Sequence, residues 1–211
     1  MPIFRKEVLS AQRKARLRKI SSTQVVIKSG KQNRFVRVLA KDWRLKNAPF
    51  STINRFFHDR PQKVISDFST KNPNKKMNVL DWGCFDGRAV RDLAKNSSLN
   101  VFGFSRDAHP GMLNARNATF LNTEKPQLIR YLKKHKIKID LIFSRMGLQY
   151  VPLEELVSHL IELKECLSIG GKIFPGVIGL LEHSEEIKLL ENKGYRFDYE
   201  GEFVISLTRV K

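Results

Sequence analysis

The segment best suited to chemistry is 79–90, in which a short apolar run ends at Asp81 and two glycines follow, Gly83 and Gly87. A helix-forming stretch begins near Arg88. Glycines let a backbone approach a ligand closely, and the first turn of a helix offers N–H donors that have no partner inside the helix. In an open α/β sheet, ligands bind at the carboxyl ends of the strands. The pattern therefore predicts a ligand-binding turn at that edge of a sheet.

The elements that position this turn follow a regular alternation. Short apolar runs alternate with helical patterns, which is typical of parallel strands buried on both faces and of a doubly wound α/β sheet. The chain ends in two strand-like runs, 195–200 and 203–209, which predict an antiparallel hairpin. The remaining expected elements lie at 78–81, 88–95, 101–105, 108–117, 128–134, 139–144, 154–167, 172–178 and 185–193.

The polar stretch 69–76 breaks both helical and strand patterns, so it marks a domain boundary. The sequence thus predicts a basic N-terminal extension or cap, residues 1–76, and an α/β domain, residues 77–211. Within the extension, two short helices are expected between residues 47 and 68, and short strands or buried patches are expected at 23–28 and 35–39.

The first motif of the α/β domain resembles that of the class I S-adenosylmethionine-dependent methyltransferases. Asp81, Gly83, Cys84 and Gly87 match the family pattern, and Phe85 stands where the family usually has its middle glycine. The main structural alternative, a nicotinamide-binding turn, lacks support because its Gly-x-Gly-x-x-Gly spacing is missing. The resemblance implies a Rossmann-like sheet of seven strands, mostly parallel, that binds S-adenosyl-L-methionine with its amino-acid portion facing Asp81.

Later segments extend the resemblance. Ser105 occupies the position where the family has an acidic residue that binds the ribose, and its hydroxyl can still make one such bond. Asn122 and Thr123 fall where family members present polar groups to adenine, and Ser144 follows the fourth strand of the family pattern. These four residues complete the predicted cofactor site.

No catalytic residue stands out, since methyl transfer from a sulfonium depends mainly on positioning and on exclusion of water. Gln149 and Tyr150 are candidates for orienting a substrate, although Tyr150 equally suits a packing role. The loop lacks the Asn/Asp-Pro-Pro-aromatic sequence of many adenine-N6 and glutamine-N5 methyltransferases. Cys84 and Cys166 fit buried packing positions better than nucleophiles, and no metal site is expected because the cysteines and histidines lack ligand spacing.

The net charge of +18 is unevenly distributed along the chain. Residues 1–76 hold 20 basic and 4 acidic residues, whereas residues 77–211 hold 19 and 17. A dense positive charge attracts polyanions, which predicts contact with nucleic acid, RNA rather than DNA, through residues 1–76. A solvated tail and an acidic membrane surface are the alternatives.

No apolar run is long enough to span a bilayer, and the two cysteines form no disulfide framework. The expected location is the cytoplasm, with an organellar matrix as the alternative because the first residues are rich in arginine. The leading hypothesis is a methyltransferase acting on RNA. Its alternatives are an inactive methyltransferase-like RNA-binding or ribosome-associated factor, motivated by Phe85 and Ser105, and a small-molecule methyltransferase, the branch that the motif series resembles most.

Overall fold

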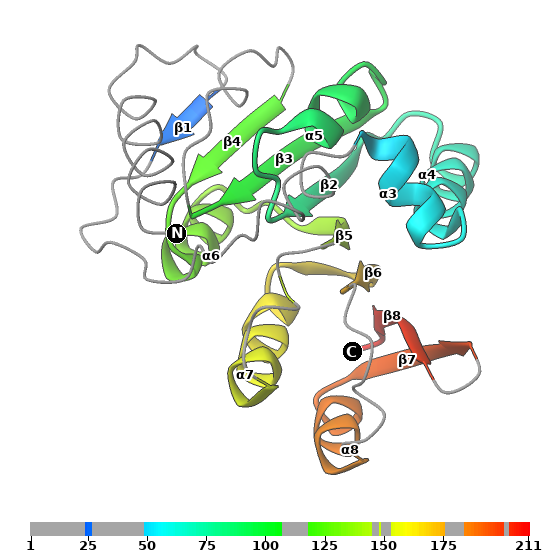
Figure 1. Cartoon of the computed structure of the whole chain (residues 1–211), viewed down its shortest axis with the longest axis vertical. Helices are drawn as coiled ribbons and strands as arrows, with labels where there is room; N and C mark the ends of the chain where they lie inside the picture. The colour runs from blue at the N-terminus through cyan, green and yellow to red at the C-terminus, as the bar shows by residue number, and fades with distance from the viewer. Residues whose placement is uncertain are drawn as a thin grey trace, which may run out of the picture.

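The computed structural model describes residues 24–26, 49–106, 118–144, 148, 153–175, 184–200 and 203–211. These residues form one eight-stranded sheet in the order β1-β4-β3-β2-β5-β6-β8-β7, shown in Figure 1. The strands are β1 (Gln24–Val26), β2 (Met77–Trp82), β3 (Leu99–Ser105), β4 (Ala118–Asn122), β5 (Ile139–Phe143), β6 (Leu167–Phe174), β7 (Tyr195–Glu200) and β8 (Phe203–Arg209). The helices are α3 (Phe50–Phe56), α4 (Arg60–Lys71), α5 (Arg88–Leu93), α6 (Lys125–Lys134), α7 (Leu153–Lys164) and α8 (Ser184–Asn192).

The strand order has a switch point between β2 and β5. From β2 the chain moves outward through β3 to β4, then returns to place β5 on the other side of β2, followed by β6. All of these pairs are parallel, whereas β8 pairs antiparallel with both β6 and β7. The predicted doubly wound sheet with an antiparallel C-terminal hairpin is confirmed, and the seven strands β2 to β8 have the order of the class I methyltransferase fold.

The sheet has one strand more than the seven predicted. The added strand, β1, pairs in parallel with the outer edge of β4, so that Gln24 lies opposite Phe120. An edge strand carries unpaired N–H and C=O groups that another segment can satisfy. The short strand expected at 23–28 therefore joins the main sheet, whereas the segment 35–39 lies outside the described residues.

Helices cover both faces of the sheet. Apolar side chains of α3, α4 and α5 form one buried cluster with residues such as Val79 and Leu141, and those of α6, α7 and α8 form the other with residues such as Leu80 and Ile142. Adjacent strand residues alternate between the two clusters because successive side chains point to opposite faces. This alternation explains the continuous apolar runs in the sequence.

The helices α3 and α4 confirm the two short helices expected before the sheet. The Phe50 ring lies 5.6 Å from the Phe143 ring, and the Phe57 ring, just after α3, lies 5.5 Å from the Phe174 ring. These rings belong to the buried cluster that α3, α4 and α5 form on one face of the sheet. The helix α4 continues into the polar stretch 69–76, where Ser69 donates a hydrogen bond to the Ile65 carbonyl. The domain division at residue 76 stays a prediction.

The boundaries predicted around β6 were wrong. The helix expected at 154–167 ends at Lys164, and the strand expected at 172–178 begins at Leu167. Leu167 pairs with Ile139, after which the register shifts so that Lys172 pairs with Leu141. Gly170 adopts a φ of 77° within this irregular stretch, so the residues expected between the helix and the strand instead belong to a strand with an irregular register. The helix expected at 108–117 lies outside the described residues.

Candidate cofactor site

Polar side chains gather where the strands β2 to β5 end. Five of the nine buried polar or charged side chains in the described part of the chain lie at this carboxyl edge. They are Asp81 (4% exposed), Ser105 (6%), Asn122 (4%), Thr123 (1%) and Ser144 (0%). The structure thus brings together five of the residues predicted from the sequence, on four neighbouring strands. Burying polar groups away from water is costly unless other groups bind them, so any of these side chains that the protein leaves without a partner is suited to a polar ligand.

Asp81 is the buried carboxyl group at the centre of this edge. Its strand position lies between Gly103 on β3 and Phe143 on β5. Burial, aided by the nearby Asp86 carboxylate, raises the pKa of Asp81 from 3.8 to about 8. The carboxyl group is therefore mostly protonated at neutral pH, and a cationic ligand group beside it would favour its ionised form.

The turn after Asp81 keeps a left-handed backbone at three positions, Gly83 (φ 88°), Phe85 (φ 47°) and Gly87 (φ 73°). The amides of Gly83 and Cys84 both donate to the Phe104 carbonyl, at 2.8 and 2.9 Å, which ties the turn to β3. A phenylalanine in this region carries strain on the order of 1 kcal/mol that glycine would avoid. The turn therefore has the backbone shape of a glycine motif although Phe85 replaces the middle glycine.

The side chains of Phe120 and Cys84 pack closely against glycines of the turn and of β3. A Cβ atom added to Gly87 would lie 2.5 Å from Cε1 of Phe120, and one added to Gly103 would lie 2.9 Å from Sγ of Cys84. Burial raises the pKa of the Cys84 thiol well above its ordinary value, so Cys84 is a neutral packing residue as expected. Only glycine fits at positions 87 and 103 without movement of these neighbours.

Asp86 holds the start of α5. Its Oδ1 accepts a 3.0 Å hydrogen bond from the Arg88 amide, and Arg91 Nη1 donates to the Asp86 carbonyl at 2.6 Å. Both arginines also lie within ion-pair distance of the Asp86 carboxylate, at 3.5 and 4.0 Å. This role was not predicted from the sequence, although an aspartate just before a helical pattern is a common signal of a helix start.

The ends of β3 and β4 are joined by polar contacts. The Asn122 side-chain amide and the Thr123 backbone amide both donate to the Ser105 carbonyl, at 3.0 and 3.2 Å. The buried Oγ1 of Thr123 and Oε1 of Gln127 have no hydrogen-bond partner among the described residues. Two such atoms, four positions apart in the chain, fit a bound polar group. Gln127 was not predicted, and its position in the first turn of the helix after a strand was the available signal.

Ser144 shapes the turn after β5. Its Oγ accepts a 2.9 Å hydrogen bond from the Leu148 amide, and its own amide donates to the Phe174 carbonyl at 2.8 Å. The two substrate candidates, Gln149 and Tyr150, lie outside the described residues. In the parts of the chain that the structure describes, no three metal-binding side chains gather, and no helix is long and apolar enough to cross a membrane.

No protein-family model and no curated protein matches the sequence. Many solved structures do match. Magnesium protoporphyrin IX methyltransferase from Synechocystis PCC 6803 matches at 18% identity and a TM-score of 0.49, over 99% of this chain and 96% of that one. A TehB-like methyltransferase from Corynebacterium glutamicum matches at 14% identity and a TM-score of 0.46, over 76% and 97%.

Other solved structures match over smaller parts of the two chains. The fibrillarin pre-rRNA processing protein of Methanococcus jannaschii matches at 16% identity and a TM-score of 0.45, over 65% of this chain and 68% of that one. The chain spans about half the length of two others, 53% of an amino pentose methyltransferase from Micromonospora echinaspora and 49% of a plantazolicin methyltransferase. At low sequence identity, the chain is structurally similar to many class I S-adenosylmethionine-dependent methyltransferases and has their strand order.

Proposed function

We propose that this protein binds S-adenosyl-L-methionine at the carboxyl edge and transfers its methyl group to an acceptor. The observation that carries the proposal is the set of buried polar side chains at the ends of β2 to β5, beside the switch point of the sheet. Open α/β sheets bind ligands at that point. The unpartnered Oγ1 of Thr123 supports a ligand that supplies the missing hydrogen bond.

The roles of the residues follow from their places along the edge. Asp81, with its carboxyl group beside the glycine turn, would hold the ligand's ammonium group. Ser105, at the end of β3, would give one hydrogen bond to the ribose. Thr123 and Gln127, beyond β4, would contact the adenine. When bound, the cofactor supplies a methyl group activated by its positive sulfur, so the protein's task is to align the acceptor and exclude water.

A small molecule is the first candidate for the acceptor. The motif series after Asp81 resembles that branch of the family most. At the carboxyl edge, Arg88 and Arg91 are paired with Asp86, and Lys125 lies 2.9 Å from Glu162. Basic residues that are already paired with acids offer less attraction to phosphate, so this edge gives little support to an RNA acceptor.

RNA, the leading expectation from the sequence, is the second candidate. The charge of residues 1–76, 20 basic against 4 acidic residues, is the observation that favours it. Most of that segment lies outside the described residues, so contact through it stays a prediction. The inactive alternative also stays open, since Phe85 and Ser105 depart from the family pattern.

Calorimetric titration of the full chain with S-adenosylmethionine tests the cofactor proposal, and two threonines provide a matched comparison. Thr123 and Thr208 both have a buried Oγ1 without a partner in the described residues, but Thr208 lies on β8, far along the sheet. We expect Thr123→Val to weaken binding about fivefold or more, the cost of one lost hydrogen bond. Thr208→Val should leave the affinity unchanged.

Absence of binding at millimolar cofactor, or equal losses in the two valine variants, would refute the proposed site. The acceptor is tested separately with methyl-labelled cofactor, the protein and either total RNA or a small-molecule extract. Label in the small-molecule fraction supports the first candidate, and label in precipitated RNA supports the second. Binding without transfer to either fraction would favour the inactive alternative.

A further inference from the structure

The described strands also have a second edge, at their amino ends, and basic residues concentrate there. We use the name basic edge for the turns 71–76, 94–98, 133–138, 164–166, 191–194 and 209–211. Together these turns hold twelve basic residues and two acidic ones, Glu165 and Glu191. Ten of the twelve are exposed. The basic residues are Lys71, Lys75, Lys76, Lys95, Lys133, Lys134, Lys136, Lys138, Lys164, Lys193, Arg209 and Lys211.

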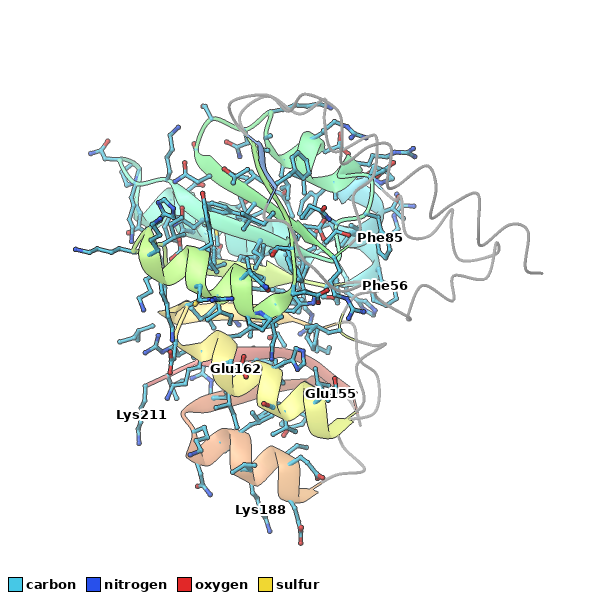
Figure 2. All side chains as sticks on the ribbon, turned by 90° about the vertical axis from the view of Figure 1, so that its left-hand side faces the viewer. Phe56, Phe85, Glu155, Glu162, Lys188 and Lys211 are labelled. Carbon is cyan, nitrogen blue, oxygen red and sulfur yellow. The ribbon has the colours of Figure 1, made fainter. Side chains whose placement is uncertain are left out.

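The sheet topology places these turns on one side of the molecule. Strands β2, β3, β5, β6 and β7 begin there, and β8, which runs antiparallel to β6, ends there. Figure 2 shows Lys211 on the opposite side of the molecule from Phe85 and Glu155. In residues 77–211, nine of the 19 basic residues but only two of the 17 acidic residues lie at the basic edge. The near balance of charge in that segment therefore conceals an excess of positive charge at the edge away from the candidate cofactor site.

Hydrogen bonds hold neighbouring turns of the basic edge together. Lys138 donates to the Glu165 carbonyl at 2.5 Å, and Lys133 forms an ion pair with the Glu165 carboxylate. Arg209 donates to the Lys164 carbonyl at 2.9 Å, and Lys164 in turn donates to the Lys193 carbonyl. The turns before β5, β6 and β7 and the end of β8 are thus joined into one connected surface.

Lys136 occupies a position that normally favours glycine. It follows His135, the C-terminal cap of α6, and has a φ of 54°. Helices commonly end with glycine at this left-handed position, because a side chain adds strain there. The amide of Ile137 donates to the Leu132 carbonyl at 2.9 Å, which completes the helix end. A lysine at this place keeps a charge on the basic edge although glycine would suit the backbone better.

We propose that the basic edge binds the phosphate backbone of RNA. Exposed lysines spread along a row of turns neutralise the phosphates of a linear polyanion and release its counterions. From β3 to β7 the row crosses six strands, or about 25 Å at the usual strand spacing. A membrane surface is disfavoured because Val210 is the only exposed large apolar side chain within these turns, and interfacial binding needs an apolar face.

RNA bound at this edge would be an anchor rather than the methyl acceptor. Each central strand separates the two edges by about 20 Å, the length of six residues. The proposal does not depend on cofactor binding or on methyl transfer. Its test therefore uses RNA binding alone, without cofactor, so that its failure and failure of the proposed methyltransferase activity are distinguishable.

The test measures the affinity of the full chain for a short single-stranded RNA of mixed sequence, across a series of salt concentrations. The test variant is Lys134→Gln with Lys136→Gly. The matched control is Arg55→Gln with Lys188→Gln, which removes the same charge from exposed positions on α3 and α8. Apart from Arg55, any contribution of residues 1–76 to RNA binding is the same in the native protein and in both variants. A larger loss of RNA affinity in the test variant than in the control therefore reports on the basic edge.

We expect the test variant to bind about fivefold more weakly per lost contact near 0.1 M salt, with a salt slope smaller by about 1.4 for two contacts. The control should change far less. Because Lys136→Gly relieves strain, the melting temperature should not fall, which excludes misfolding as the cause. Equal losses in both variants, no loss in the test variant, or binding to phosphatidylserine vesicles in place of RNA would overturn the proposal.

Discussion

Polar side chains are buried at the carboxyl edge of the sheet, whereas basic side chains are exposed at its amino edge. At the carboxyl edge, Asp81, Thr123 and Ser144 are almost completely buried. At the amino edge, ten basic side chains are exposed to water. A buried polar group needs a specific partner in place of water, whereas exposed charges act through a field that salt screens. This contrast underlies the two proposals, a cofactor site at the carboxyl edge and an RNA-binding surface at the basic edge.

Each edge also holds one residue with a side chain at a backbone position suited to glycine. Phe85 has a φ of 47° in the turn after β2, and Lys136 has a φ of 54° at the end of α6. The conformational cost is similar in the two cases, but the side chains differ in kind. Phe85 adds apolar volume beside the candidate cofactor site, and Lys136 adds positive charge.

The largest expected effect compares two glycines with similar backbone angles. A Cβ atom added to Gly87 (φ 73°) would lie 2.5 Å from the Phe120 ring, whereas one added to Gly170 (φ 77°) would meet nothing within 4 Å. Gly87→Ala should therefore cost about 3 kcal/mol of unfolding free energy, from strain and overpacking together. Gly170→Ala should cost about 1 kcal/mol, from strain alone. Urea unfolding measures both, and equal costs would contradict the close packing beneath the turn.

The second effect concerns the buried carboxyl group of Asp81. Its pKa is raised by burial and by Asp86 from 3.8 to about 8, so the folded state retains a proton that the unfolded state releases. The stability of the native protein should fall as pH rises through this window and level off above it. Asp81→Asn removes the titrating group and should be more stable at pH 8, by on the order of 2 kcal/mol.

Asp140, at the amino end of β5, provides the contrast for Asp81. It is also buried, but it accepts hydrogen bonds from the Asn78 amide at 2.9 Å and from Ser168 Oγ at 2.7 Å. Asp140→Asn should lower the stability at neutral pH by about 1 kcal/mol, because an amide replaces one acceptor. Unfolding curves across pH compare the two variants. If Asp81→Asn were less stable than the native protein at pH 8, burial of the ionised Asp81 carboxylate would not be destabilising, contrary to this prediction.

The third effect concerns the backbone strain at Phe85 and the influence of its ring on cofactor binding. Phe85→Gly should raise the unfolding free energy by up to about 1 kcal/mol, since glycine adopts a positive φ without strain. It should also strengthen cofactor binding if the aromatic ring narrows the site. Phe85→Ala shortens the side chain but keeps most of the strain, so it separates the two contributions. Weaker binding in both variants would instead show that the ring contributes to the site.

The smallest effect concerns Lys136 at the amino edge. Lys136→Gly should stabilise the protein by about 0.5 to 1 kcal/mol, because the end of α6 then has its preferred residue. Thermal unfolding measures the change, with Arg130→Gly as the control inside the helix, where glycine should destabilise by a similar amount. A destabilised Lys136→Gly protein would show that the lysine side chain has a structural role.

The sequence predicted the sheet well because its strands carry a simple signal. The apolar runs around Val79, Val101 and Ile142 alternate with helical patterns, and burial on both faces produces such runs. The added strand β1 was only partly foreseen, because three residues contain no information on which edge they join. The start of β6 was misplaced because a register shift beside Gly170 has no periodicity to detect.

The candidate site was predicted in part. Asp81 and the glycine turn have a recognisable spacing, and the structure places Ser105, Asn122, Thr123 and Ser144 at the same edge. The roles of Asp86 and Gln127 depend on helix geometry and on burial, which spacing alone does not reveal. The basic edge was overlooked for a similar reason, since its lysines come from six separate turns that only the folded sheet brings to one side.

Calorimetric titration with S-adenosylmethionine at pH 7, in two buffers of different ionisation enthalpy, tests the central claim most directly. Because the pKa of Asp81 is raised to about 8 by burial and Asp86, ammonium binding beside it should release close to one proton. The same titration of Asp81→Asn should show weaker binding and no such release. Binding without a difference in proton release between the two proteins, or no binding to the native protein, would contradict the assignment of the carboxyl edge as the cofactor site.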